Sequence, residues 1–143
     1  MNQPIQDLLD RYKGDAISLR RKLHQSPELS MQETNTTRVI RETLEQYGIR
    51  CIEDFSLPTG VTAILEGKEP GKTLLLRADI DALPMEEKSA LPFASQHSGV
   101  CHSCGHDIHT SALLLCARIL STLEQPRRGR VILLFQPAEE TGQ

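Results

Sequence analysis

One short segment of the chain concentrates side chains that bind metal ions. Five thiol or imidazole groups fall within nine residues, just before a helix-forming stretch: Cys101, His102, Cys104, His106 and His109. Thiolate and imidazole suit zinc and its first-row neighbours, and Asp107 is placed to orient a ligating imidazole. Two other interpretations stay open at this point: a Cys101–Cys104 redox pair at a helix N-terminus, or reduced cysteines beside surface histidines.

Two carboxylates follow an apolar stretch that is typical of a strand. Asp79 and Asp81 come directly after residues 73–78. In an extended chain, residues i and i+2 point the same way, and two close acids repel each other unless a cation or a proton lies between them. The pair therefore suits a cation site, although a surface turn with aspartate caps explains the same residues.

A second pair of acids, Glu139 and Glu140, follows the apolar stretch 131–135. Adjacent side chains of an extended chain point in opposite directions, so one glutamate can bind a metal ion while the other takes a proton from water. A solvated loop explains the pair equally simply. Because the carboxyl ends of neighbouring parallel strands meet at one edge of a sheet, the acids and the Cys/His segment together predict a metal-assisted hydrolytic site.

The elements that must position these groups predict an α/β sheet with helices on its faces. Apolar residues at helical spacing mark two helices, 5–24 and 108–123, and a capping pattern marks a further helix over roughly 31–47. Strand-like runs mark four segments: 49–55, 61–66, 73–78 and 131–135. We expect a tight hairpin at residues 67–71, the continuous apolar run 73–78 at the centre of the sheet, and a long loop over residues 84–100.

Local signals define the ends of the helices. Pro27 ends the first helix, because proline restricts the residue before it. Ser30 and Glu33 resemble a capping box at the start of the second helix, and Gly48 lies where its C-terminal cap is expected. Residues 126–129 break the third helix.

Composition excludes several classes of function. The 143 residues include 16 Lys and Arg against 19 Asp and Glu, a net charge of −3, so no basic footprint for nucleic acid or anionic membranes exists. Aromatic residues that could stack bases make up only 3%. No run of about 18 apolar residues predicts a membrane span, and residues 1–7 lack the features of a secretory signal. Four cysteines without an export signal favour reduced thiols and a cytoplasmic location.

Four motifs together resemble a known enzyme family. They are Ser18–Met31, Arg77–Met85, Gly99–Thr110 and Phe135–Glu140. In this order they are similar to the dinuclear metal-dependent amidohydrolases and metallopeptidases, which include aminoacylases, hippurate hydrolases, auxin–amino acid conjugate hydrolases and N-acetyldiaminopimelate deacetylases. The resemblance implies that residues 1–143 form the N-terminal segment of a metallopeptidase-like catalytic domain, with a mixed sheet flanked by helices.

The resemblance also implies a role for individual residues. It assigns three metal ligands: Cys104, His106 and Glu140. Glu139 matches the general base that activates water, Asp81 matches the acid that supports a ligand, and Asp79 is its companion. The implied cofactors are two divalent cations, usually Zn, Mn, Co or Ni, and the implied reaction hydrolyses the amide bond of a small N-acyl amino acid.

Two departures from the family pattern bear on this interpretation. Cys101 stands where the family commonly has Met, so we expect it beside the site and not as a ligand. The family also has two further histidines, a lid and dimerisation domain through which complete members often pair, and the C-terminal half of the catalytic domain. Without these parts we expect weak metal binding, little activity and uncovered apolar sheet surface. The alternative function is a small zinc-binding or thiol redox module built on Cys101, Cys104, His106 and His109.

Overall fold

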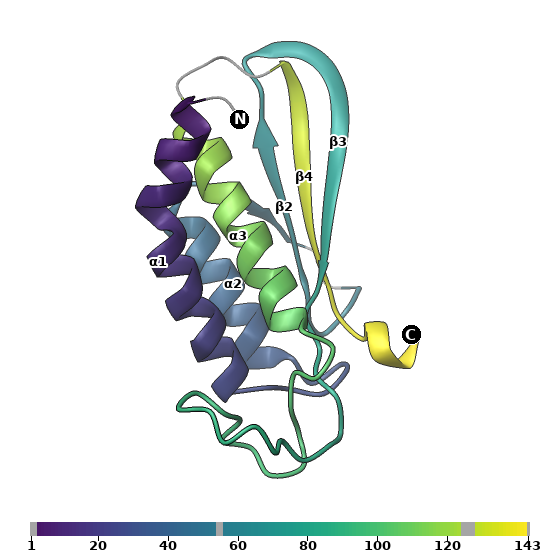
Figure 1. Cartoon of the computed structure of the whole chain (residues 1–143). Coiled ribbons are helices and arrows are strands. Elements are labelled where there is room, and N and C mark those ends of the chain that lie inside the picture. The colour runs from purple at the N-terminus through teal and green to yellow at the C-terminus, as the bar shows by residue number, and fades with distance from the viewer. Residues whose placement is uncertain (1–2, 54–55, 124–127, 143) are drawn as a thin grey trace.

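Helices and strands follow one another in the predicted order (Figure 1). The computed structural model describes residues 3–53, 56–123 and 128–142. Its helices are α1 (Gln3–Gln25), α2 (Thr34–Gln46) and α3 (His106–Thr122). Its strands are β1 (Arg50–Ile52), β2 (Val61–Glu66), β3 (Glu69–Asp79) and β4 (Arg128–Gln136), and a 3-10 turn, η1 (Glu139–Thr141), follows β4. The α/β class predicted from the sequence is confirmed.

The strands form one mixed sheet in the order β1-β2-β4-β3. β4 lies between β2, to which it is antiparallel, and β3, to which it is parallel. The predicted hairpin between β2 and β3 is therefore wrong. The glycines instead allow β3 and β4 to approach closely, because a Cβ atom on Gly71 would lie 2.6 Å from the backbone nitrogen of Gly129.

The prediction that residues 73–78 lie at the centre of the sheet is also wrong. Within the described residues β3 is an edge strand, and the Leu74 and Leu75 side chains are about half exposed, at 55% and 51%. A continuous apolar run predicts a strand that is buried on both faces, whereas the described helices pack on only one face of the sheet. The central position belongs to β4, where Leu133 and Phe135 are fully buried.

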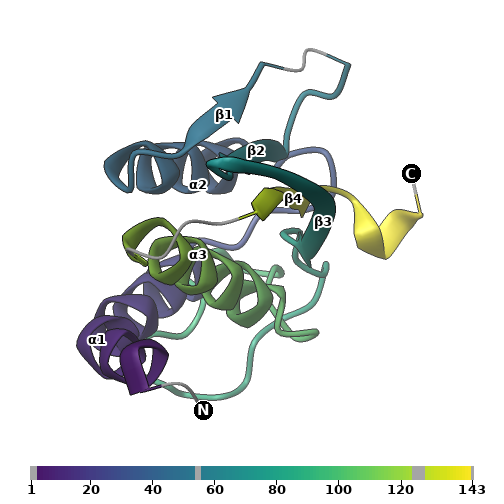
Figure 2. The ribbon, with the colours of Figure 1, turned by 90° about the horizontal axis from the view of Figure 1, so that it is seen from above.

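All three helices lie on one side of the sheet (Figure 2). α2 and α3 pack against the strands, and α1 packs against α3. The core between them is mainly aliphatic, as the composition predicts, and its largest fully buried members are Ile40, Leu44, Ile80, Leu114, Leu133 and Phe135. The expectation of helices on both faces is not met by the described residues. Among these residues no helix has the length and apolar content that a membrane span needs.

The start of α2 differs from the predicted capping box. The Glu33 side chain makes no cap hydrogen bond, and the Ser30 hydroxyl turns away to a different carboxylate. Glu28 caps the helix instead, because its carboxylate accepts hydrogen bonds from the backbone N–H groups of Asn35 (3.0 Å) and Thr36 (2.7 Å). The Glu33 side chain therefore does not cap α2, and it is completely buried.

Other boundaries shift by a few residues. Gly48 follows the helix with a positive φ of 70°, which confirms it as a terminating glycine. β1 is shorter than the predicted strand 49–55, whose residues 54–55 lie outside the described part of the chain. Residues 124–127, which include half of the predicted helix break, lie outside it as well. Residues 84–100 form the predicted long loop.

Candidate metal centre

His106, the first residue of α3, lies at the centre of the candidate site. Its Nδ1 atom is 3.0 Å from the backbone carbonyl oxygen of Asp81 and 3.3 Å from Oδ1 of the same residue. Both atoms are acceptors, so they favour a proton on Nδ1 of the ring. When Nδ1 carries the only proton, the lone pair on Nε2 is available to a ligand, which is the arrangement typical of metal-binding histidines.

Carboxylates surround the free nitrogen. His106 Nε2 lies 3.3 Å from Asp79 Oδ2, 3.7 Å from Glu139 Oε2 and 3.7 Å from Glu140 Oε1. Asp79 and Asp81 thus face opposite nitrogens of one ring, so the imidazole of His106 lies between the two carboxylates, where their i, i+2 spacing predicted a shared cation or a proton. The ends of β3 and β4 and the start of α3 converge here, which confirms the expected meeting of the three segments at one edge of the sheet.

The three ligands implied by the resemblance lie together. One donor atom from each of Cys104, His106 and Glu140 can be chosen so that all three lie within 4.8 Å of one another. Cys104 is exposed, Glu140 is partly buried and His106 is buried. Their roles as ligands stay predictions, but sulfur, nitrogen and oxygen donors at this separation suit a divalent first-row cation.

The electrostatics of Cys104 and Glu140 also fit a cation. Hydrogen bonding to the Glu140 carboxylate, then burial and the charges of Glu140, Glu139 and Asp81, raises the pKa of the Cys104 thiol. The buried Oε1 atom of Glu140 receives no N–H or O–H hydrogen bond from the described residues. A divalent cation would lower the pKa of the Cys104 thiol by stabilising its thiolate. It would also give the Oε1 atom of Glu140 a partner.

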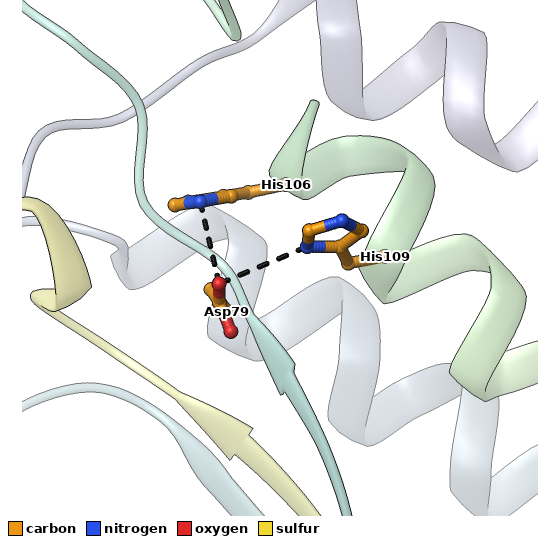
Figure 3. A group of neighbouring side chains, drawn as sticks. All are labelled: Asp79, His106 and His109. Atoms are coloured by element: carbon orange, nitrogen blue, oxygen red, sulfur yellow. Dashed lines mark ion pairs between the residues drawn. The ribbon is translucent and has the colours of Figure 1, made fainter. Parts of the chain in front are cut away.

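A second group of possible ligands shares His106. Asp79 Oδ2 lies 3.7 Å from His109 Nδ1 as well as 3.3 Å from His106 Nε2, and the two imidazole rings stack with centroids 5.6 Å apart (Figure 3). The sequence prediction gives Asp79 as the companion of Asp81, and it uses His109 as a ligand only in the alternative Cys/His module. The signal in the sequence was the i, i+3 spacing of the two histidines, which puts His106 and His109 on one face of a helix.

The two glutamates follow β4 in a 3-10 turn and not in extended chain, so the prediction that they point oppositely for that reason is wrong. The turn is entered through Ala138, which has a positive φ of 56°. The Glu140 N–H donates to Asp81 Oδ2 at 3.0 Å, and the Ser30 hydroxyl donates to the same oxygen at 2.7 Å. Burial raises the pKa of Asp81, but hydrogen bonds from Glu140 and Ser30 outweigh it, and the net pKa is lowered.

A buried charged cluster lies behind the site. Asp107 Oδ2 lies 2.7 Å from Arg20 Nε and 2.7 Å from His24 Nδ1, and the other nitrogen of His24 lies 3.1 Å from Glu87 Oε1. Asp107 therefore orients His24, and the prediction that it orients a ligating imidazole is wrong. The i, i+4 spacing of Arg20 and His24 was the signal in the sequence that these two side chains lie together on one face of α1. Nothing in the sequence marks Glu87 as their partner.

The remaining members of the Cys/His segment lie outside both possible ligand groups. Cys101 is buried, and its sulfur lies 2.9 Å from the Ser103 hydroxyl oxygen. His102 is buried, and neither ring nitrogen has a hydrogen-bond partner among the described residues. Burial lowers the pKa of His102 to about 4, although Asp107 opposes the shift, so this ring is neutral near pH 7. A four-ligand module that includes Cys101 is not assembled by the described residues.

Known proteins to which this chain is similar include peptidases and deacetylases. Residues 75–143 match the sequence model of peptidase family M20/M25/M40. The chain is 52% identical over 134 residues to an N-acetyl-L-cysteine deacetylase of Bacillus subtilis, an alignment that covers 94% of this chain and 32% of that protein. It is 45% identical over 143 residues to the thermostable carboxypeptidase 1 of Saccharolobus solfataricus, covering 95% of this chain and 36% of that protein.

A solved structure shares the fold. The YXEP protein of Bacillus subtilis, a dinuclear metal binding peptidase from the M20 family, superposes with a TM-score of 0.89 at 44% identity. The match covers 92% of this chain and 37% of that protein. The chain thus spans about a third of the length of the curated relatives that it matches.

Proposed function

We propose that this chain, which matches about a third of the length of relatives that include a dinuclear metal binding M20 peptidase, supplies one part of a dinuclear metal site that hydrolyses amide bonds of N-acyl amino acids. The observation that carries the proposal is the meeting of Cys104, His106 and Glu140 donor atoms within 4.8 Å, with the Glu139 carboxylate beside them. Zn, Mn, Co and Ni all suit this donor set.

Each residue has a role in the proposed reaction. Cys104, His106 and Glu140 hold a cation, which when bound polarises the amide carbonyl and makes water more acidic. Asp81 fixes both the ring of His106 and the backbone of Glu140. Glu139, whose side chain is 39% exposed and open to substrate, takes a proton from the attacking water. It then gives that proton to the leaving amine, so that water and amide become a carboxylic acid and an amine.

The relatives support the substrate class. One of them is an N-acetyl-L-cysteine deacetylase and another a carboxypeptidase, and both names denote cleavage of an amide bond. We propose a small N-acyl amino acid as substrate, and further ligands for the two cations from residues outside these 143. The four cysteines are free thiols, which supports a location in the reducing cytoplasm.

Cobalt binding tests the ligand set on the 143-residue chain. Thiolate coordination to Co²⁺ gives an intense near-ultraviolet charge-transfer band. We expect this band in the wild-type chain and in Cys101→Ser, and we expect Cys104→Ser to lose it. The opposite result, with the band dependent on Cys101, would replace the proposal by the separate Cys/His module.

Activity tests the base in the protein at its full natural length. N-acetyl amino acids are the substrates, and released amino acid is measured. Glu139→Gln should reduce kcat about 10²–10⁴-fold, whereas the exposed Glu42→Gln on α2 should not change it. Full activity of Glu139→Gln would overturn the mechanism, and cleavage of unacylated peptides alone would change the substrate class.

A further inference from the structure

Glu33 is a buried carboxylate that neither the helix cap nor the ligand set uses. Its side chain is completely buried, although it directly precedes α2 and makes no cap hydrogen bond. Burying a carboxylate is costly unless hydrogen bonds compensate the lost water. The groups that donate hydrogen bonds to the Glu33 carboxylate therefore indicate its role.

Both oxygens of Glu33 accept hydrogen bonds from distant segments. The Thr59 hydroxyl, in the turn before β2, donates to Oε2 at 2.7 Å. The backbone N–H of Ala138, which follows β4 and lies 105 residues away in sequence, donates to Oε1 at 2.9 Å. Both donors are themselves buried. Glu33 thus connects the start of α2 with the turn that carries Glu139 and Glu140.

This turn needs such support because its backbone is unusual. Ala138 adopts a φ of 56°, a left-handed conformation that residues with a Cβ atom rarely adopt. The neighbouring Pro137 packs closely on Gly60, because a Cβ atom added to Gly60 would lie 2.7 Å from Cδ of Pro137. The turn is therefore held at Ala138 by Glu33 and at Glu140 by Asp81, with Glu139 between the two bonds.

We propose that Glu33 is a positioning residue, which holds the turn after β4 so that the carboxylates of Glu139 and Glu140 face Nε2 of His106. The inference rests on the proposed function, in which Glu140 is a ligand and Glu139 the base. Glu33 touches neither the cation nor the substrate and acts only through the backbone of the turn.

Position and charge can be separated because two conservative variants change one property each. Glu33→Gln keeps the length and loses the charge. Its amide oxygen can accept from Ala138 N–H, and its amide nitrogen can donate to the Thr59 hydroxyl, which is able to rotate and accept. Glu33→Asp keeps the charge, but it is one methylene shorter and cannot reach both donors. A positioning role predicts that Gln replaces Glu better than Asp does, and a purely electrostatic role predicts the reverse.

The test is a Co²⁺ titration of the 143-residue chain, with the charge-transfer band and the dissociation constant as readouts. We expect Glu33→Asp to weaken binding about tenfold or more, as for other residues that orient a ligand, and to retain the Cys104 band at saturation. Glu33→Gln should bind within about threefold of the wild type. Exposed Glu42→Asp is the matched control for the same chemical change. Circular dichroism and urea unfolding show that each variant is folded under the titration conditions.

The outcomes distinguish this inference from the proposed function. Wild-type affinity in folded Glu33→Asp, or a tenfold loss in Glu33→Gln, overturns the positioning role while the metal site itself stands. A wild-type chain that shows no thiolate band, even at the highest Co²⁺ concentration, overturns metal binding by these 143 residues alone, and with it any role of Glu33 in that binding. If Glu33→Asp does not fold, Thr59→Val serves in its place. It removes one of the two bonds, and an affinity above that of Glu33→Gln would contradict the inference.

Discussion

The two ends of the β3–β4 pair share one parallel ladder but are built differently. At the site end (residues 76–81 and 133–140), Ala78 and Phe135 are buried, and carboxylates from distant segments bind the backbone. At the far end (residues 66–75 and 128–132), the side-chain links are exposed: an ion pair between Glu69 and Arg128 at 2.9 Å and a hydrogen bond from Arg130 Nε to the Thr73 hydroxyl oxygen at 3.1 Å. Such exposed pairs contribute little to stability.

The comparison shows where this chain concentrates its specificity. Backbone hydrogen bonds are the principal means of pairing the strands at the far end. The site end adds buried polar side chains, each of which is costly unless its partners are in place. We therefore expect substitutions at the site end to be severe and those at the far end to be mild. The following predictions test this difference from the largest effect to the smallest.

Phe135→Ala should cause the largest loss of stability. The side chain is completely buried in β4 between the sheet and the helices, so its removal leaves a cavity in the core. We expect the free energy of unfolding to fall by about 3–5 kcal/mol, measured by urea denaturation with the slope m compared between variants. Phe135→Leu, which keeps most of the volume, should lose much less. A loss below about 1 kcal/mol in Phe135→Ala would mean that the site end is not the tightly packed region.

Glu28→Ala should have an intermediate effect. Its carboxylate accepts two backbone N–H groups in the first turn of α2, and α2 buries Ile40 and Leu44 against the sheet. Loss of a helix cap costs about 1 kcal/mol, again measured by urea denaturation. Glu42→Ala breaks an exposed i, i+4 pair with Arg38 on the same helix and should cost about 0.5 kcal/mol or less. Equal effects of the two variants would show that Glu28 caps nothing in solution.

Stability should also fall with acid through Glu87, which belongs to the buried charged cluster behind the site. Burial raises the pKa of Glu87, but hydrogen bonds from the Ser89 hydroxyl, the Ser95 N–H and His24 lower it to about 2, from an ordinary value of 4.5. A group with a lowered pKa in the folded state stabilises the fold above its unfolded pKa. This contribution should therefore be present above pH 4.5 and disappear as the pH falls toward about 2.

Urea unfolding at a series of pH values measures this contribution. After allowance for solvent screening, about 1 kcal/mol of the acid-dependent loss should be absent in Glu87→Gln. Glu69→Gln, at the far end, is the control for the same chemical change. If Glu87→Gln follows the wild-type curve at every pH, the hydrogen bonds around Glu87 do not persist in solution.

The same contrast explains what the sequence could predict. Periodicity is a local property, so helices α1 and α3 and strands β2 and β4 were all predicted to within a few residues. The candidate ligands Cys104, His106 and Glu140 were recognisable because each motif is contiguous. Chain order alone does not reveal that β4 inserts between β2 and β3, because that pairing joins segments far apart in sequence.

Buried polar partners were the other part that the sequence did not reveal. Glu33 meets Ala138 across 105 residues, and His24 meets Asp107 across 83. The spacing of Glu33 from Ser30 fits a capping box, so a local pattern assigns it there. A local motif and a long-range bond compete for the same side chain, and only the fold shows that the buried N–H of Ala138 donates to it. Such residues shape the site without belonging to any short motif.

Leu75→Thr should have the smallest effect. The Leu75 side chain is 51% exposed on β3 at the far end, and threonine suits a strand as well as leucine does. We expect the free energy of unfolding to stay within about 0.5 kcal/mol of the wild type, against the loss of several kcal/mol in Phe135→Ala. The measurement is urea denaturation at two protein concentrations tenfold apart. A loss above about 1 kcal/mol would show that something covers Leu75 in solution. Dependence of that loss on concentration would identify the cover as a second copy of the chain, and the difference between the two ends would then disappear on assembly.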